Sequence, residues 1–345
     1  MKGFVLSKFA FNEAVAWIIR ETMEQWERQN LSPYASLSSE TLGRDREEPL
    51  CDIRPAYQRD RDRILHSKSF RRLKDKTQVF LAPEGDHYRT RLTHTLEVSQ
   101  IARTIAKALR MNESLTEAIA LGHDLGHTPF GHAGEYILNE ICEDGFAHYK
   151  QSVRVVEILE KKGQGLNLTK EVRDGMLNHR TSGNPATMEG KIVRFSDKIA
   201  YINHDIDDAI RGKIITERDI PREYSDVLGD TVKDRLNIMI HDIINNSMDR
   251  PSIFMSPDVE RAMRGLREWM FEHVYRNPAA KGEEGRAQQL IVTLYEYYLK
   301  HVDELPEEYL AMMELRGEKR ERVVCDYIAG MSDGYAIDRF EELFV

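Results

Sequence analysis

The sequence concentrates histidines and carboxylates between residues 121 and 135, where three histidines and two carboxylates occur within fifteen residues. His123 and Asp124 are adjacent there, so on a helix their side chains would point about 100° apart. Both can reach a common point beside the helix only if that point is a metal ion held against its last turn. An imidazole next to a carboxylate suits a divalent ion such as Mn, Mg, Fe, Ni or Zn.

Two further residues complete this candidate metal site. His94 lies in an earlier stretch of helical periodicity, and Asp197 lies in a later one. With His123 and Asp124 they supply two neutral imidazoles and two carboxylates, which leaves coordination positions open for water and a substrate oxygen. A single histidine in a helix is commonly a core or capping residue, so the prediction of a metal site depends on the ordered set of four.

Helical periodicity dominates the chain and strand-like alternation is nearly absent, which predicts an all-α fold. Apolar residues have helical spacing over 91–110, and a capping box at Ser114 and Glu117 predicts the start of the next helix. We expect a further helix from Gly131 and a long one over 189–211. Other helices are expected at 4–19, 151–162, 169–180 and through much of the last third, with connectors at 31–58 and 276–287.

Composition limits what the protein can be. The 345 residues include 49 Lys and Arg against 58 Asp and Glu, which gives a formal net charge of −9. This acid excess argues against non-specific coating of nucleic acid. The charges within 4–19 favour an amphipathic helix over a signal peptide, and the chain has no apolar run of about 18 residues that would span a membrane. Three scattered cysteines indicate reduced thiols in a cytoplasmic protein.

Longer strings around the candidate ligands resemble a known family. His94, the adjacent His123 and Asp124, and Asp197 are similar to the metal ligands of the HD-domain phosphohydrolases. Thr128 departs from the pattern, because many members carry proline there. Six longer strings narrow the resemblance to one group of this family, the deoxynucleoside triphosphate triphosphohydrolases of the bacterial dGTPase-like branch. They are QRDRDRILHS (58–67), FRRL (70–73), KTQV (76–79), RLTH (91–94), HTPFGHAGE (127–135) and LREWMFEHVY (266–275).

The resemblance implies an HD-type helical fold with additional C-terminal helices, in three regions. Residues 1–53 would form an N-terminal helix and lead-in, and 54–211 the catalytic core. Residues 212–345 would complete the pocket and build the interface of a homo-oligomer. Members of the family are also implicated in contacts with single-stranded DNA, for which the basic segment 59–76 is the candidate here. No membrane partner is expected.

The implied reaction cleaves a deoxynucleoside triphosphate between its 5′-oxygen and α-phosphorus, releasing deoxynucleoside and triphosphate. The leaving alkoxide needs a proton. His132 and Glu135 are three residues apart, so on a helix Glu135 can raise the pKa of His132 and orient it as the general acid. The alternative is that His132 only caps the helix. His127 and His148 are further candidates for bordering the phosphates or the sugar.

Substrate contacts are expected from the helix over 189–211, where Asp197, Tyr201 and Asp205 share one face. The resemblance places Tyr201 against the deoxyribose, where its ring would exclude a 2′-hydroxyl, and Asp205 near the 3′-hydroxyl. The remaining candidates are Gln78 at the sugar or base and, for the charge of the triphosphate, Arg91, Lys198 and the segment 59–76.

Two other functions stay open. One is an HD phosphomonoesterase or cyclic-nucleotide phosphodiesterase, which need not carry His132, Glu135, Tyr201 and Asp205. The other is a non-catalytic regulator that binds a nucleotide or single-stranded DNA. The identity of the base, of the native metal and of any activating nucleotide is not determined by the sequence.

Overall fold

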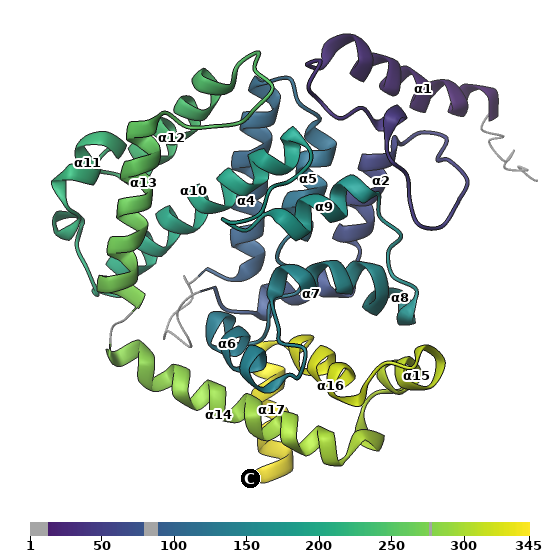
Figure 1. Ribbon diagram of the computed structural model, residues 1–345, viewed down its shortest axis with the longest axis vertical. Helices are drawn as coiled ribbons and strands as arrows, with labels where there is room; N and C mark the ends of the chain where they lie inside the picture. The colour runs from purple at the N-terminus through teal and green to yellow at the C-terminus, as the bar shows by residue number, and fades with distance from the viewer. Residues whose placement is uncertain (1–12, 79–88, 276–277) are drawn as a thin grey trace, which may run out of the picture.

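The computed structural model describes residues 13–78, 89–275 and 278–345 (Figure 1). In these ranges the only β pairing is an isolated bridge between Thr77 and Thr90, so the predicted all-α fold is confirmed. None of the described helices combines the length and the apolar character that crossing a membrane requires. Residues 4–12 of the expected N-terminal helix lie outside the described residues, and α1 (Glu13–Asn30) contains the rest.

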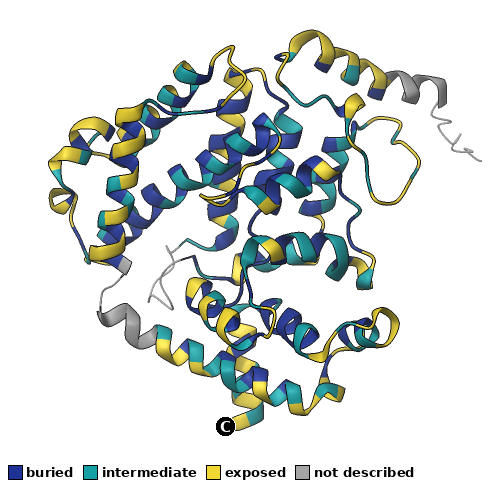
Figure 2. Cartoon of the chain, viewed as in Figure 1, coloured by how far each residue is buried: buried dark blue, intermediate teal, exposed yellow. Residues whose placement is uncertain are grey.

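A group of packed helices forms the centre of the molecule. Helices α4 (Arg91–Ala108), α5 (Glu113–Gly122) and α10 (Met188–Arg211) pack against one another, while α2 (Ala56–Leu65) and α9 (Lys170–Asn178) pack on α5 (Figure 1). Apolar residues at three- and four-residue spacing give each long helix a stripe that must be covered. Burial of one such side chain contributes about 2 kcal/mol. Figure 2 shows that much of these central helices is buried. The fully buried residues include Ile101, Ile105, Ile119, Ile192 and Ile199.

The start of α5 differs from the prediction. Oδ1 of Asn112 accepts the backbone N–H groups of Ser114 and Leu115 at 3.1 and 3.2 Å, so Asn112 is the N-cap. The predicted capping box at Ser114 and Glu117 is therefore wrong. Glu117 instead faces Arg61 at 3.3 Å, because α5 packs against α2.

Helix α6 (Gly131–Ile141) begins where predicted, after a residue in the left-handed region, Phe130. The helix expected over 151–162 begins earlier and is irregular. It consists of α7 (His148–Arg154), a π-helical turn (Val155–Leu159) and α8 (Glu160–Gly163).

A second apolar core joins α6 to the C-terminal helices α14 (Pro278–Lys300), α15 (Glu307–Arg316), α16 (Arg320–Ala329) and α17 (Asp333–Phe344). The exposed loop expected over 276–287 is wrong, because α14 already begins at Pro278. Proline fits the first turn of a helix since its missing N–H would have no partner there.

Several of the remaining helices add buried residues to the first core (Figure 1). The remaining helices and turns are α3 (Lys68–Arg72), α11 (Arg222–Leu228), α12 (Val232–Ser247), α13 (Pro257–Met270), the π-helical turn Phe271–Tyr275 and the short 3₁₀ turns Ser38–Glu40, Leu73–Asp75, Glu217–Asp219 and Val302–Glu304.

Candidate active site

The four predicted metal ligands lie together at the junction of three helices. His94 projects from α4, His123 and Asp124 follow the last turn of α5, and Asp197 projects from α10. Oδ1 of Asp197 lies 3.2 Å from Nε2 of His94 and 3.7 Å from Nε2 of His123. Oδ1 of Asp124 lies 3.5 Å from the same His123 nitrogen. His94, His123 and Asp124 are buried and have potential ligand atoms within 4.8 Å of one another, while Asp197 is half-buried.

The atoms of this cluster fit a divalent cation. Nε2 of His123 is buried and has no hydrogen-bond partner among the described residues, because its Nδ1 is the nitrogen directed at the carbonyl of Ala120. Burial alone would raise the pKa values of Asp124 and Asp197, but the surrounding histidines hold both well below the usual range. Two carboxylates and a buried imidazole nitrogen without a hydrogen-bond partner surround one point, which is a set of oxygen and nitrogen donors that suits a divalent ion.

A second group of potential ligand atoms, from Asp124, His127 and His148, shares Asp124 with the first. The rings of His127 and His148 are stacked, with centroids 4.1 Å apart and planes only 13° from parallel. Metals bind along the in-plane lone pairs of imidazole, and two stacked rings cannot both direct such lone pairs at one ion. The geometry therefore favours the cluster of His94, His123, Asp124 and Asp197.

Arg91 holds one of the candidate ligands in place. Its Nη1 donates to Oδ2 of Asp124 at 2.9 Å, and its Nη2 donates to the carbonyl of Gln78 at 3.2 Å. Both side chains of the ion pair are almost fully buried. Arg91 is expected from the sequence to supply charge for the substrate, but in the structure its guanidinium is directed at Asp124. Oδ1 of that carboxylate lies 3.5 Å from Nε2 of His123 and 3.3 Å from Nε2 of His127.

The predicted pair of His132 and Glu135 is present, with a closer third member. Nδ1 of His132 lies 3.4 Å from Oε2 of Glu135, while Nδ1 of His148 lies 2.8 Å from Oε1. Burial would raise the pKa of Glu135, but the hydrogen bonds from these two imidazoles outweigh it and hold the pKa far below its usual range. The ring of His132 is 75% exposed, which leaves it accessible to a ligand.

These groups open onto one cavity of about 390 Å³. It is lined by three of the candidate metal ligands, His94, Asp124 and Asp197, together with His132. Of the predicted substrate contacts, six line it: Gln78, Arg91, His127, His148, Tyr201 and Asp205.

Two sets of predicted cations are not among the residues that line this cavity. Lys198 turns toward Phe195, with its ammonium 5.6 Å from the ring centre. No residue of the basic segment 59–76 lines it either. Several arginines of this segment pair with acids, as Arg61 does with Asp62 at 2.8 Å. Their expected role toward the triphosphate is therefore not supported.

Sequence reasoning missed several residues that line the cavity. The imidazole of His179 is buried just after α9, and its Nε2 lies 3.3 Å from Nε2 of His148. Burial lowers the pKa of His179 to about 4, so the ring is neutral near pH 7. Its sequence signal was a histidine next to arginine at the end of an expected helix. The other missed residues are Phe130, Ala133, Arg180, Thr181, Arg267, Phe271 and Glu284.

Comparison with known proteins bears on this site. The family model of the HD domain matches residues 91–202, which contain all four candidate metal ligands. A second model, described as a phosphohydrolase-associated domain, matches residues 253–342.

Curated relatives are similar over nearly the whole chain. A deoxyguanosinetriphosphate triphosphohydrolase-like protein of Caldanaerobacter subterraneus subsp. tengcongensis is 57% identical, over 95% of this chain and 96% of the relative. Relatives of the same name from Clostridium perfringens and Desulfatibacillum aliphaticivorans are 48% and 47% identical, over 95% and 94% of this chain and 98% of each relative. Among solved structures, a hypothetical protein from Aquifex aeolicus is 20% identical with a TM-score of 0.47, over 81% of this chain and 67% of that one.

Proposed function

Because this chain belongs to the HD-domain family of deoxyguanosinetriphosphate triphosphohydrolase-like proteins, we propose that it hydrolyses a deoxynucleoside triphosphate to deoxynucleoside and triphosphate. The observation that supports this most is the arrangement of one cavity, which is lined both by three candidate metal ligands, His94, Asp124 and Asp197, and by the two imidazoles that Glu135 holds, those of His132 and His148. The volume of about 390 Å³ falls in the range of cavities that enclose small organic ligands.

A divalent ion would be held by His94, His123, Asp124 and Asp197, and when bound it would polarise a phosphoryl oxygen and lower the pKa of a water molecule. The protein's own part begins with Arg91, whose hydrogen bond fixes the orientation of the Asp124 carboxylate. The metal is proposed to be Mn, Mg, Fe, Ni or Zn, since the donor set of nitrogens and oxygens suits all of them.

His132 is proposed to protonate the leaving 5′-oxygen. Its Nδ1 faces Glu135, so Nε2 is the nitrogen available to a substrate in the cavity. The Glu135 carboxylate lies 3.4 Å from that Nδ1 and orients the ring, and a positioned imidazole is a common general acid. His148 is held by the same carboxylate and borders the cavity beside His127.

The sugar is proposed to contact the face of α10 that carries Tyr201 and Asp205, and the triphosphate to contact two arginines that line the same cavity. Tyr201 and Asp205 line it one and two turns beyond Asp197, which supports their expected contacts with the deoxyribose. Arg180 and Arg267 also line it, and no salt bridge involves either within the part of the chain that the structure describes. We therefore propose these two arginines, in place of Lys198, as the cations that meet the triphosphate.

Product analysis tests the proposal. The purified protein is incubated separately with each deoxynucleoside triphosphate and with Mn or Mg, and the products are separated by ion-exchange chromatography. Intact triphosphate together with deoxynucleoside is the expected result, and the preferred substrate identifies the base. Release of pyrophosphate or single phosphate would favour a different HD phosphohydrolase. The expected homo-oligomer and single-stranded DNA contact stay predictions, which light scattering and a DNA-binding assay would test.

A further inference from the structure

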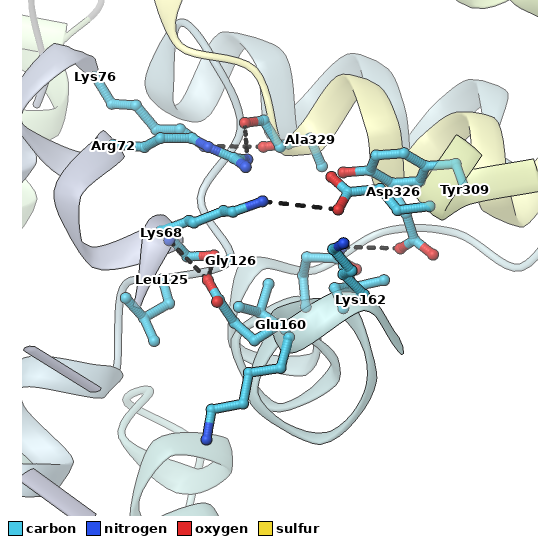
Figure 3. Close-up of a pocket in the computed structure, with 17 residues that line it drawn as sticks. Lys68, Arg72, Lys76, Leu125, Gly126, Glu160, Lys162, Tyr309, Asp326 and Ala329 are labelled. Atoms are coloured by element: carbon cyan, nitrogen blue, oxygen red, sulfur yellow. Dashed lines mark hydrogen bonds and ion pairs between the residues drawn. The ribbon is translucent and has the colours of Figure 1, made fainter. Parts of the chain in front are cut away.

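The connection between α16 and α17, together with Ala329 and Asp333 at its two ends, contacts segments of the chain that line the catalytic cavity. Nζ of Lys76 donates to the carbonyl of Ala329 at 2.8 Å and also to the carbonyl of His127, which lines the cavity. Arg72 donates to the carbonyl of Gly330. Figure 3 shows both side chains directed at this end of α16, which lines a small hollow together with them.

The basic residues around this hollow hold the C-terminal helices to the core. The two more buried ones, Arg72 and Lys76, already donate to backbone carbonyls, and Lys68 lies 3.7 Å from Glu308. Their N–H donors therefore connect the C-terminal turn to the core instead of presenting a site for an anion.

The carboxylate of Asp333, the first residue of α17, makes the most direct connection to the cavity. Its Oδ2 accepts the backbone N–H of Thr77 at 2.9 Å, and its Oδ1 accepts the backbone N–H of Phe130 at 2.9 Å. Thr77 immediately precedes Gln78, and Phe130 lies two residues before His132. One carboxylate therefore joins two separate segments that carry residues of the cavity wall.

The segment beginning at Phe130 needs such a connection. Phe130 has φ 59° and ψ 28°, the left-handed region that a non-glycine residue occupies only when its surroundings hold it there. Phe130 is also the N-cap of α6 and provides no side-chain cap to that helix. A Cβ atom on Gly131, the next residue, would lie 3.2 Å from the carbonyl oxygen of Gln78, so the two segments are closely apposed. A shift of either segment would move His132 relative to Gln78.

We propose that Asp333 is a positioning residue of the active site, which holds the Phe130 turn and the Thr77–Gln78 segment together so that His132 is aimed at the scissile bond. This role rests on the proposed function, because it concerns the geometry of the general acid. Both carboxylate oxygens are required, since each accepts one N–H. The C-terminal helices therefore contribute to catalysis through a residue that does not line the cavity.

Hydrogen exchange and kinetics of the full chain test this role together. Asp333→Asn leaves one acceptor oxygen and turns an NH₂ toward the other amide, while Asp333→Glu keeps two acceptors. Ser332→Ala is the matched control for the stability of α17, because Ser332 caps that helix through the N–H of Tyr335. Asp338→Asn controls for the loss of one carboxylate from an exposed position on the same helix.

In the wild type we expect peptides containing Thr77 and Phe130 to exchange slowly. Asp333→Asn should speed exchange in both and lower kcat by about tenfold to 100-fold, with a smaller change in KM and unchanged metal content, since small displacements of catalytic groups cost this much. Asp333→Glu should recover part of the loss. Ser332→Ala and Asp338→Asn should resemble the wild type in all of these measurements.

Rapid exchange of both amides in the wild type would overturn the role of Asp333, and this measurement does not need a folded variant. A kcat for Asp333→Asn no lower than that of Ser332→Ala would overturn it as well. If the wild type hydrolysed no deoxynucleoside triphosphate, the proposed function would fail, whereas the exchange measurement would still decide whether Asp333 holds the two segments.

Discussion

Oε1 of Glu135 lies 2.8 Å from Nδ1 of His148 and also accepts the backbone N–H of His148 at 2.8 Å. The two residues belong to different helices, so this carboxylate fixes the start of α7 relative to α6. Its other oxygen faces His132 at 3.4 Å. Glu135 therefore couples the proposed general acid to a second imidazole of the cavity, and its removal should affect both stability and activity.

In the acid range, the free energy of unfolding should vary less with pH in Glu135→Gln than in the wild type. The pKa of Glu135 is lower in the folded protein than in the unfolded chain. The ionised carboxylate therefore stabilises the folded state fully above the ordinary pKa of 4.5, and this stabilisation is lost as the pH falls toward the lower pKa of the folded state. At pH 5 to 6 we expect Glu135→Gln to be less stable than the wild type by about 2 kcal/mol, the size of a charge-assisted hydrogen bond. Chemical denaturation at several pH values measures the difference.

The difference between wild type and Glu135→Gln should shrink as the pH is lowered below about 4. Glu140→Gln is a suitable control, because Glu140 lies on an exposed position of the same helix, α6. A difference that stays constant down to pH 2 would show that Glu135 acts through packing and not through its charge.

Substitution His132→Ala should keep the bound metal while lowering kcat by roughly 100-fold or more, the usual effect of losing an acid–base group. The reason is that His132 lies on α6, whereas the candidate metal ligands come from α4, α10 and the end of α5. Steady-state kinetics and elemental analysis of the purified variant provide the two readouts. Loss of the metal from His132→Ala would contradict the assigned role.

Two aspartates on one helix should separate metal binding from substrate binding. Asp197→Ala should remove metal and activity together, because Oδ1 of Asp197 faces both His94 and His123. Asp205→Asn, two turns along α10, should retain the metal and raise KM. Metal content and kinetics of the two variants are compared side by side, and equal metal loss in both would refute the assignment.

Substitution Tyr201→Ala should weaken discrimination against ribonucleotides. The ring of Tyr201 lines the cavity and is expected to occupy the space that a 2′-hydroxyl would need. We expect the ratio of kcat/KM for a deoxynucleoside triphosphate over its ribonucleotide to fall by about tenfold or more. Tyr201→Phe keeps the ring and should keep the ratio. A ratio unchanged in Tyr201→Ala would remove this residue from sugar selection.

Chelation of the metal should lower the melting temperature as well as the activity. A ligand present at 100 times its Kd stabilises the folded state by about 2.7 kcal/mol. Removing the metal should cost the protein this stabilisation and leave the carboxylates of Asp124 and Asp197 close together without a cation between them. Calorimetry measures the resulting fall in melting temperature. Adding back Mn should restore both properties. The Asp197→Ala variant is the control, because a chelator should not change its melting temperature.

The differences between prediction and structure have local and distant causes. The cap of α5 was misplaced by two residues because Asn112, Ser114 and Glu117 offer competing local hydrogen bonds, and only the folded backbone selects Asn112. The segment 276–287 has the composition of a loop. It falls largely within α14, whose later residues Ile291 and Leu294 are fully buried in the second core. Tertiary packing of that kind overrides local propensity.

The same distinction applies to the site. His123 and Asp124 were accessible to prediction because they are adjacent, and His94 and Asp197 because each lies on a strongly periodic helix. The pairing of Arg91 with Asp124 and the position of His179 in the cavity wall could not be predicted from neighbouring residues in the sequence. Both arise where separate helices pack against one another.

Residue type and short-range spacing are properties of the chain itself, so the sequence alone determined the all-α class, the family resemblance and the set of candidate metal ligands. The tertiary structure decided which of those groups share a cavity and which cations form ion pairs with neighbouring acids. It also decided that Asp333 accepts the N–H of Phe130, 203 residues away in the sequence. Contacts of that range depend on how helices pack, because the hydrogen bonds that join them leave no periodic trace in the sequence.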